Sequence, residues 1–251
     1  GTLSSVPETH NRAKNQSVVN NIVRSFLNYK RMSTLEDLED ESGEEVETMT
    51  AAEVLKKLEE AWLNEKFAED LLEAKTDLVE CMMEQISEME DNIRRAKKGD
   101  FKVSIHRLEM DRIRYVLSSY LRSRLIKIEK FATHLLEEEK VRKDDEPSKL
   151  SPEEFTFAKD YDKSLESHLR TLALRHMPAH IQSLDPKQTA VRPNLDKYVF
   201  LRVNEDTEGV LVEEETLDTG EEIVDMKRGD QHIMRYRPVA PLVASGAVSL
   251  I

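Results

Sequence analysis

One long helical segment constrains the fold of this chain more than any other feature. Between Asp100 and about Glu139, apolar residues recur at the spacing of one helix face: Ile113, Val116, Leu117, Tyr120, Leu121, Ile128 and Phe131. About 38 residues at about 1.5 Å per residue give a rod on the order of 55 Å long, which is longer than a compact domain needs. The sequence therefore predicts a helical bundle built around one long helix.

Three shorter helical segments accompany the long one. Capping boxes mark two of their starts, at Thr50–Glu53 and at Ser151–Glu154 with Pro152 in the first turn, and Thr76 begins the remaining segment. A basic last turn followed by Gly99 is expected to end the second segment, and Pro178 the third. Residues 50–177 are therefore predicted to form an all-helical domain, called the A domain.

The last quarter of the chain has a different pattern. Residues 178–197 form a linker rich in Pro, Gln and Asp, and short β-like runs follow at 198–203, 209–213 and 232–237. The run from Tyr198 to Val203 is apolar on both faces, which is typical of a strand covered on two sides. Residues 198–251 are predicted to form a small β-rich domain, the B domain, so the fold class is α+β.

The first 49 residues are predicted to be disordered. Residues 33–49 hold eight acidic and no basic residues, so this stretch repels itself too strongly to collapse. Two interpretations of residues 1–31 stay open: a native segment, or an extension that precedes a natural start at Met32.

The sequence lacks the motifs of common enzyme classes, including a GxxxxGK phosphate loop and a GxSxG nucleophile elbow. With a single cysteine, Cys81, the chain forms neither an internal disulfide nor a cysteine-based zinc finger. His176 and His180 have the spacing of a helical zinc site, but Pro178 between them is expected to break the helix. We therefore predict a protein that is not an enzyme and that needs no metal or cofactor.

Membranes and DNA are not expected as direct partners. The sequence has no run of about 18 apolar residues and no secretory leader. Six basic residues between Arg112 and Lys130 ring the long helix, so they form no single phosphate-tracking stripe. The expected compartment is the cytosol or the nucleus.

The long helix carries a second face that does not look solvated. Tyr115, Ser119, Arg122 and Ile126 lie opposite the main apolar stripe, where a helix buried on one face should present charges. Tyrosine and arginine are common anchors of protein interfaces. Two explanations stay open: another helix of the same domain covers this face, or a partner subunit does.

The carboxyl end of the chain is a second segment that does not look solvated. The last fourteen residues carry no charge, whereas chain ends are usually polar and frayed. We expect this tail to be docked, either into its own domain or onto a partner. Its candidate contact residues are Leu242, Val243, Val248, Leu250 and Ile251.

Six segments give the chain a family resemblance. They are EAWLNEKFAEDLLE (60–73), SIHRLEMDRIRYVLSSYLRSRLIKIEKF (104–131), LSPEEFTFAK (150–159), RHMP (175–178), YVFLRV (198–203) and APLVASGAVSLI (240–251). In this order they resemble subunits of the GINS complex of eukaryotic DNA replication, and among them the Sld-five type. The likeness runs from about residue 50 to residue 251.

The resemblance implies an all-helical A domain before a β-rich B domain, and a heterotetramer with the three Psf subunits as partners. It also implies that the tetramer joins the Mcm ring and the Cdc-forty-five protein in the CMG helicase, in the nucleus, and connects to replicative polymerases. ATP hydrolysis belongs to the Mcm ring, so the implied role is non-catalytic. In yeast-like members the amino-terminal segment docks on a trimeric replisome hub, and Leu35 and Leu38 are the candidates for that contact here.

Two rival functions are a generic helical adaptor for another multiprotein complex and an enzyme with an unrecognised helical active site. The adaptor would pair its long helix with a coiled-coil partner, which requires an apolar heptad repeat held over several turns. The main apolar stripe drifts at about 3.6 residues instead, which favours a bundle.

Overall fold

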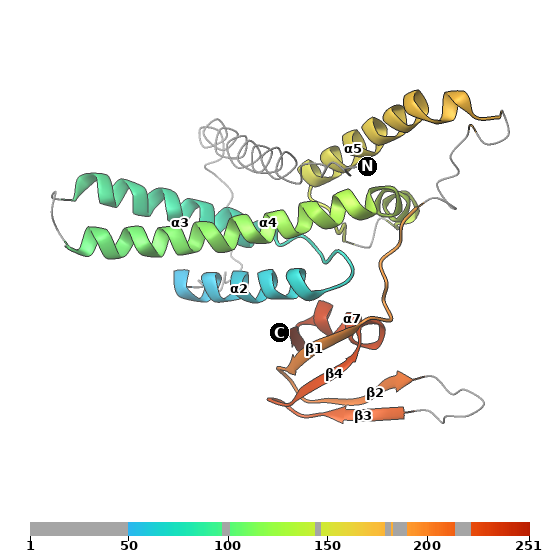
Figure 1. The fold of residues 1–251 in the computed structure, drawn as a ribbon. Coiled ribbons are helices and arrows are strands. Elements are labelled where there is room, and N and C mark those ends of the chain that lie inside the picture. The colour runs from blue at the N-terminus through green and yellow to red at the C-terminus, as the bar shows by residue number, and fades with distance from the viewer. Residues whose placement is uncertain (1–49, 97–100, 144–146, 179–181, 183–189, 214–221) are drawn as a thin grey trace, which may run out of the picture. The chain divides into compact units, whose positions relative to one another are not determined.

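A computed structural model describes residues 50–96, 101–143, 147–178, 182, 190–213 and 222–251 (Figure 1). The helical part consists of α2 (Ala51–Phe67), α3 (Thr76–Arg95), α4 (Phe101–Val141) and α5 (Pro152–Leu172), followed by a 3-10 turn (Leu174–His176). Helix α4 has 41 residues, so the predicted long helix is confirmed, with a kink at Phe131 (φ −117°, ψ 19°). None of the described helices is long and apolar enough to cross a membrane.

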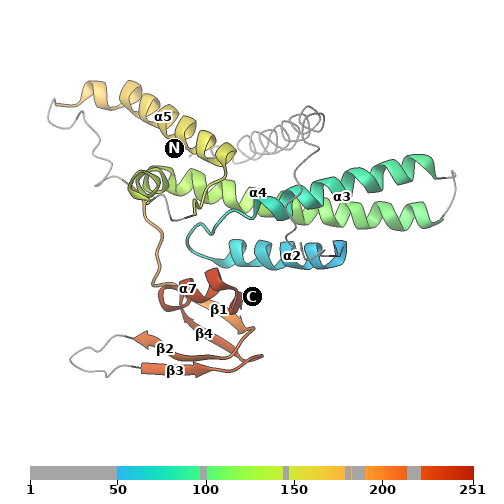
Figure 2. The same ribbon diagram turned by 180° about the vertical axis from the view of Figure 1, so that it is seen from behind.

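Two apolar clusters hold the helices together. Helices α2 and α3 both pack against α4, and the three lie along one another in the two opposite views (Figures 1 and 2). Their shared core consists of Val54, Leu58, Val79, Met82, Ile86, Ile113, Val116, Leu117 and Tyr120. Beyond this core, the end of α4 packs on the start of α5 through Ile128, Phe131, Leu135, Leu136, Leu150 and Ala158. Six of the seven residues of the predicted apolar stripe are buried in these cores, Leu121 is partly buried, and Leu135 and Leu136 extend the stripe beyond the prediction.

The helix ends agree only partly with the sequence prediction. The capping box of α5 is confirmed, because the Ser151 hydroxyl accepts from the Glu154 N–H and the Glu154 carboxylate accepts from the Ser151 N–H. Helix α3 ends at Arg95 with Ala96 extended, and the predicted cap Gly99 lies outside the described residues. Helix α5 ends at Leu172, before Pro178, because the chain tightens into the 3-10 turn first.

The described residues of the B domain form five strands and one helix. These are β1 (Tyr198–Val203), β2 (Thr207–Glu213), β3 (Glu222–Met226), β4 (Gln231–Arg235), α7 (Tyr236–Ser245) and β5 (Val248–Leu250). Strand β1 lies between β4 and β5 in an antiparallel sheet, and β2 pairs with β3 in a hairpin. Residues 236–237, predicted as the end of a strand, instead begin α7. That helix ends at Gly246, whose φ of +84° suits a residue without a side chain.

One side of the β4–β1–β5 sheet faces the core of the B domain. Val199, Leu201 and Val203 of β1 are buried there, and α7 contributes Val239 and Val243. The alternate residues of β1 are exposed, so the prediction of a strand covered on both faces is wrong for this chain alone. The apolar residues of the second face, Tyr198 and Phe200, are open to solvent.

Helix α2 contacts the B domain directly. The Leu250 N–H donates to the Asn64 side-chain oxygen at 2.7 Å, and Ala68, which follows α2, belongs to the B-domain core. The described residues of Ala51–Ile251 therefore form one compact unit. The Tyr236 side chain is buried in this B-domain core.

We expect the Tyr236→Phe variant to lose less stability at alkaline pH than the parent chain. Burial raises the pKa of Tyr236 above its ordinary value of 10.0, and the nearby carboxylates Asp70, Glu65 and Glu69 add to the rise. Above about pH 10 the unfolded tyrosine ionises while the folded one keeps its proton, so the free energy of unfolding falls as pH rises, by up to about 1.4 kcal/mol per pH unit. Urea unfolding between about pH 9 and pH 11.5 measures this slope, and equal slopes in the two chains would contradict it.

Candidate partner interface

Helix α4 presents a regular seam of residues on the side away from its buried stripe. Successive positions are alternately four and three residues apart, which is the spacing of a surface that packs against another helix. The α4 seam consists of Phe101, Ile105, Leu108, Arg112, Tyr115, Ser119, Arg122 and Ile126. Its five apolar or aromatic side chains are between 51% exposed (Ile105) and 76% exposed (Phe101).

Two predicted interface residues, Tyr115 and Ser119, meet helix α2 through a single side chain. The Trp62 indole N–H donates to the Ser119 hydroxyl at 2.9 Å, and the Trp62 ring meets the Tyr115 ring edge-on at 6.2 Å. Tyr115 nevertheless stays 64% exposed, and Ile126 52%. Arg122 is half-buried. The first explanation, cover by the chain's own helix, therefore accounts for only one edge of this face.

The sequence prediction does not include four seam residues: Phe101, Ile105, Leu108 and Arg112. They lie in the first part of α4 and are exposed. The sequence does contain the pattern that finds them, because counting back from Tyr115 in steps of three and four residues reaches Arg112, Leu108, Ile105 and Phe101. The predicted four residues are the second half of a longer surface.

The carboxyl-terminal candidates are divided by the structure. Val243, Val248 and Leu250 are buried in the core of their own B domain, and Leu242 packs partly against it. Ile251 keeps 44% of its surface exposed. The tail is therefore docked within this chain, and among its candidates Ile251 has the most surface left for a partner. Its contact with a partner stays a prediction.

A buried charge cluster holds α4 on the side opposite the seam, near the seam's carboxyl-terminal end. The guanidinium of Arg124, 1% exposed, donates to both carboxylate oxygens of Glu154 (2.7 and 2.8 Å) and to Glu65 (3.0 Å). It also donates to the carbonyls of Leu72 (2.8 Å) and Lys149 (2.7 Å). Arg124 therefore joins α2, α4, the start of α5 and the segment before α3. The sequence pattern places it only among the basic residues that ring the long helix.

Neighbouring groups complete the cluster. Lys127 donates to the buried carboxylate of Glu65 at 2.7 Å and to the Asp70 carbonyl at 2.8 Å. Burial lowers the pKa of Lys127, and the attraction of Glu65 offsets only part of this effect. Burial alone would also lower the pKa of Arg124, but its hydrogen bonds and charge attraction with Glu154 outweigh burial and raise it. Arg124 thus stays charged, which suits a structural cation and not a proton donor.

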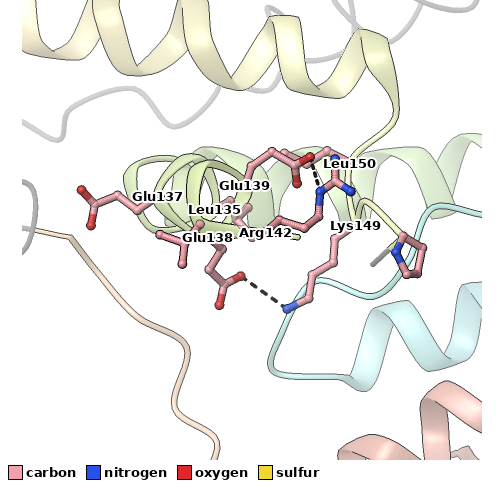
Figure 3. Close-up of a pocket in the computed structure, with 9 residues that line it drawn as sticks. Leu135, Glu137, Glu138, Glu139, Arg142, Lys149 and Leu150 are labelled. Carbon is pink, nitrogen blue, oxygen red and sulfur yellow. Dashed lines mark hydrogen bonds and ion pairs between the residues drawn. The ribbon is translucent and has the colours of Figure 1, made fainter. Parts of the chain in front are cut away.

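A cavity of about 500 Å³ lies where α4 ends and the chain turns toward α5. Figure 3 shows two pairs of side chains turned toward one another, Glu139 with Arg142 and Glu138 with Lys149, whereas Glu137 points away. Arg142 pairs with Glu139 at 2.8 Å, and Lys149 approaches Glu138 at 3.4 Å. These charged side chains form ion pairs with each other, so the cavity is a weaker candidate for a functional site than the α4 seam.

Three of the other sequence candidates, Leu35, Leu38 and His180, lie outside the described residues. His176 lies exposed in the 3-10 turn. Within the part of the chain that the structure describes, no group of three or more His, Cys, Asp or Glu side chains is placed to hold a metal ion. The α4 seam is the candidate site that the geometry supports best.

Comparison with known proteins places this architecture in a family. Residues 62–173 match the GINS complex protein helical bundle domain, and residues 193–251 match the carboxyl terminus of the DNA replication complex GINS protein SLD5. The SLD5 protein of Mus musculus is 57% identical over 213 residues, which cover 85% of this chain and 96% of the relative. The human protein is 54% identical over 213 residues (85% and 96%), and that of Arabidopsis thaliana 32% over 216 residues (82% and 94%). The chain therefore belongs to the SLD5 family of GINS subunits, whose function is in DNA replication.

Proposed function

We propose that this chain is an obligate structural subunit of a GINS heterotetramer in the nucleus, with the three Psf subunits as its direct partners. The α4 seam carries this proposal, because its exposed side chains follow the spacing of a helix-packing surface over about 38 Å. Family membership identifies the kind of partner that would complete it. The chain acts by binding alone.

In this proposal the tetramer connects the Mcm ring and the Cdc-forty-five protein in the CMG helicase, and through them the replicative polymerases. ATP is hydrolysed by the Mcm ring, and the present chain contributes a rigid brace. The buried Arg124 cluster supports that role, since it joins α2, α4 and α5 on the opposite side of α4, near the carboxyl-terminal end of the seam. Docking of Leu35 and Leu38 on a replisome hub stays a prediction from the sequence.

The seam alone also fits the rival function, a helical adaptor for another complex. Its four-and-three spacing is the repeat that such an adaptor needs. What favours GINS is the family match over both the helical part and the β-rich part of the chain.

Co-expression with the three other GINS subunits of the same organism tests the proposal. We expect the chain to give a lower yield of soluble protein when expressed alone than when all four chains are made together, because the partners cover the seam. Native mass spectrometry of the purified product should give one copy of each subunit. A stable, dispersed monomer that does not take up the other three chains would contradict the proposal.

A further inference from the structure

The B domain carries a second exposed apolar surface, on the face of the β4–β1–β5 sheet turned away from its core. Tyr198 (62% exposed), Phe200 (61%) and Ile233 (60%) form its apolar part. We call this surface the outer sheet face. It consists of Tyr198, Phe200 and Arg202 on β1 and of Gln231, Ile233 and Arg235 on β4.

Strand register fixes how these side chains are arranged. Phe200 lies directly opposite Ile233, Tyr198 opposite Arg235, and Arg202 opposite Gln231. Ile251 joins Phe200 from the other side of β1, since the Ile251 N–H donates to the Phe200 carbonyl at 3.1 Å. The face therefore has an apolar centre of one aromatic and two isoleucines, with an arginine toward each end.

The composition of the outer sheet face is that of a protein interface. Single exposed apolar residues are ordinary on a protein surface, but a contiguous patch of large ones marks a binding surface. Tyrosine, phenylalanine and arginine are enriched in such patches, and an apolar centre with a charged rim is their usual form. The Arg235 guanidinium lies 6.0 Å from the centre of the Tyr198 ring, so one arginine is already positioned by the face itself.

The charges on this face define the chemistry of its partner. Both charged side chains that it presents are arginines, although the whole chain carries a net charge of −13. Arg235 lies opposite Tyr198, which is four positions from Arg202 along β1, or about 13 Å. A complementary surface therefore offers an apolar side chain flanked by carboxylates at about that spacing.

We propose that the outer sheet face binds an apolar segment flanked by acidic residues on another GINS subunit. This inference rests on the proposed function, which supplies the class of partner. Single-stranded nucleic acid fits the face less well. Tyr198 and Phe200 carry rings, but Ile233 and Ile251 beside Phe200 offer none on which a base stacks, and the strongly acidic chain repels phosphate.

Photo-crosslinking in the assembled tetramer tests this proposal. Phe200 is replaced by p-benzoylphenylalanine in the full chain, and the four subunits are co-purified and irradiated. We expect one dominant crosslink to another subunit, in a peptide that holds Asp or Glu within about four residues of an apolar residue. The same probe at Lys227, an exposed position in the turn before β4, is the matched control and should give none.

The possible outcomes separate this inference from the proposed function. If no tetramer forms, the proposed function itself fails. If the tetramer forms but the probe at Phe200 crosslinks to nothing, or to a second copy of this chain, the outer sheet face does not contact another subunit and the inference is overturned.

Charge reversal gives an independent measurement. We expect Arg202→Glu/Arg235→Glu and Phe200→Ala each to raise the concentration at which the tetramer dissociates by about tenfold. Lys227→Glu should leave this concentration unchanged. A fluorescein-labelled 30-nucleotide oligo-dT is the second probe. If the parent tetramer bound this DNA and the double arginine variant did not, the face would be a nucleic-acid site and the proposal would be wrong.

Discussion

Replacing Arg124 by methionine is expected to lower the free energy of unfolding by about 3–5 kcal/mol, the usual cost of breaking a buried ion pair on one side. Glu65, itself 1% exposed, would keep Lys127 as its partner, but Glu154 would lose both of its bonds to the guanidinium. The carbonyls of Leu72 and Lys149 would lose their donor as well. Methionine fills much of the volume, so lost polar partners dominate the expected effect.

Arg112 offers a matched control for this substitution. It also links α4 to α2, through Glu59, but its side chain is 52% exposed. Arg112→Met is therefore expected to cost less than about 1 kcal/mol. Urea unfolding of the full chain, followed by circular dichroism, compares the two variants. Equal losses would show that the Arg124 cluster contributes no more than a surface ion pair.

A further variant separates charge burial from packing. Arg124→Met/Glu154→Gln removes the cation together with the carboxylate that would lose both of its bonds to it, while Glu65 keeps Lys127 as its partner. We expect this double variant to recover part of the stability lost in Arg124→Met. If the double variant were less stable than Arg124→Met, uncompensated charge would not be the cause of the loss.

Local sequence patterns predicted most of the helical architecture, for a physical reason. Helix starts depend on a few neighbouring side chains, so the box of Ser151 and Glu154 was visible in the sequence. The apolar stripe of α4 was visible because one face of a helix repeats every 3.6 residues. The kink at Phe131 was not predicted, because no proline or glycine lies next to it in the sequence.

Arg124 shows what such patterns miss. At 100° per residue it lies about 20° from Ile113, within the apolar stripe, so its place on the helix already indicated burial. The residue type instead indicates exposure, because arginine is seldom buried without partners. Those partners come from segments 30 and 59 residues away in the chain, and only the fold brings them together.

The tail and strand β1 illustrate a second limit. Hydrophobicity correctly indicated that the tail would be docked, but it could not distinguish the chain's own core, where Leu250 lies, from a partner's surface. Strand β1 is apolar on both faces, and the chain covers one of them. In both cases the hydrophobic residues indicate that a surface is buried. Whether the same chain or a partner buries it depends on the tertiary and quaternary structure.

The α4 seam leads to the second large effect. We expect Leu108→Glu/Ile126→Glu to weaken assembly with the other GINS subunits by about 100-fold or more, because two carboxylates would be buried against apolar surface without partners. Both side chains are more than half exposed in the isolated chain, so its own free energy of unfolding should change by less than about 1 kcal/mol. Loss of assembly with the monomer intact is the signature of an interface.

Two controls make this result specific to the seam. Arg107→Glu changes the net charge by the same amount, −2, at an exposed position of α4 beside the seam, and should leave assembly unchanged. Leu108→Met/Ile126→Val keeps the seam apolar and should preserve most of the affinity. Native mass spectrometry of the co-expressed subunits over a dilution series measures the three variants side by side. A full-strength tetramer containing Leu108→Glu/Ile126→Glu would show that this face is open to solvent in the assembled complex, and the partner helix would then have to lie elsewhere on the chain.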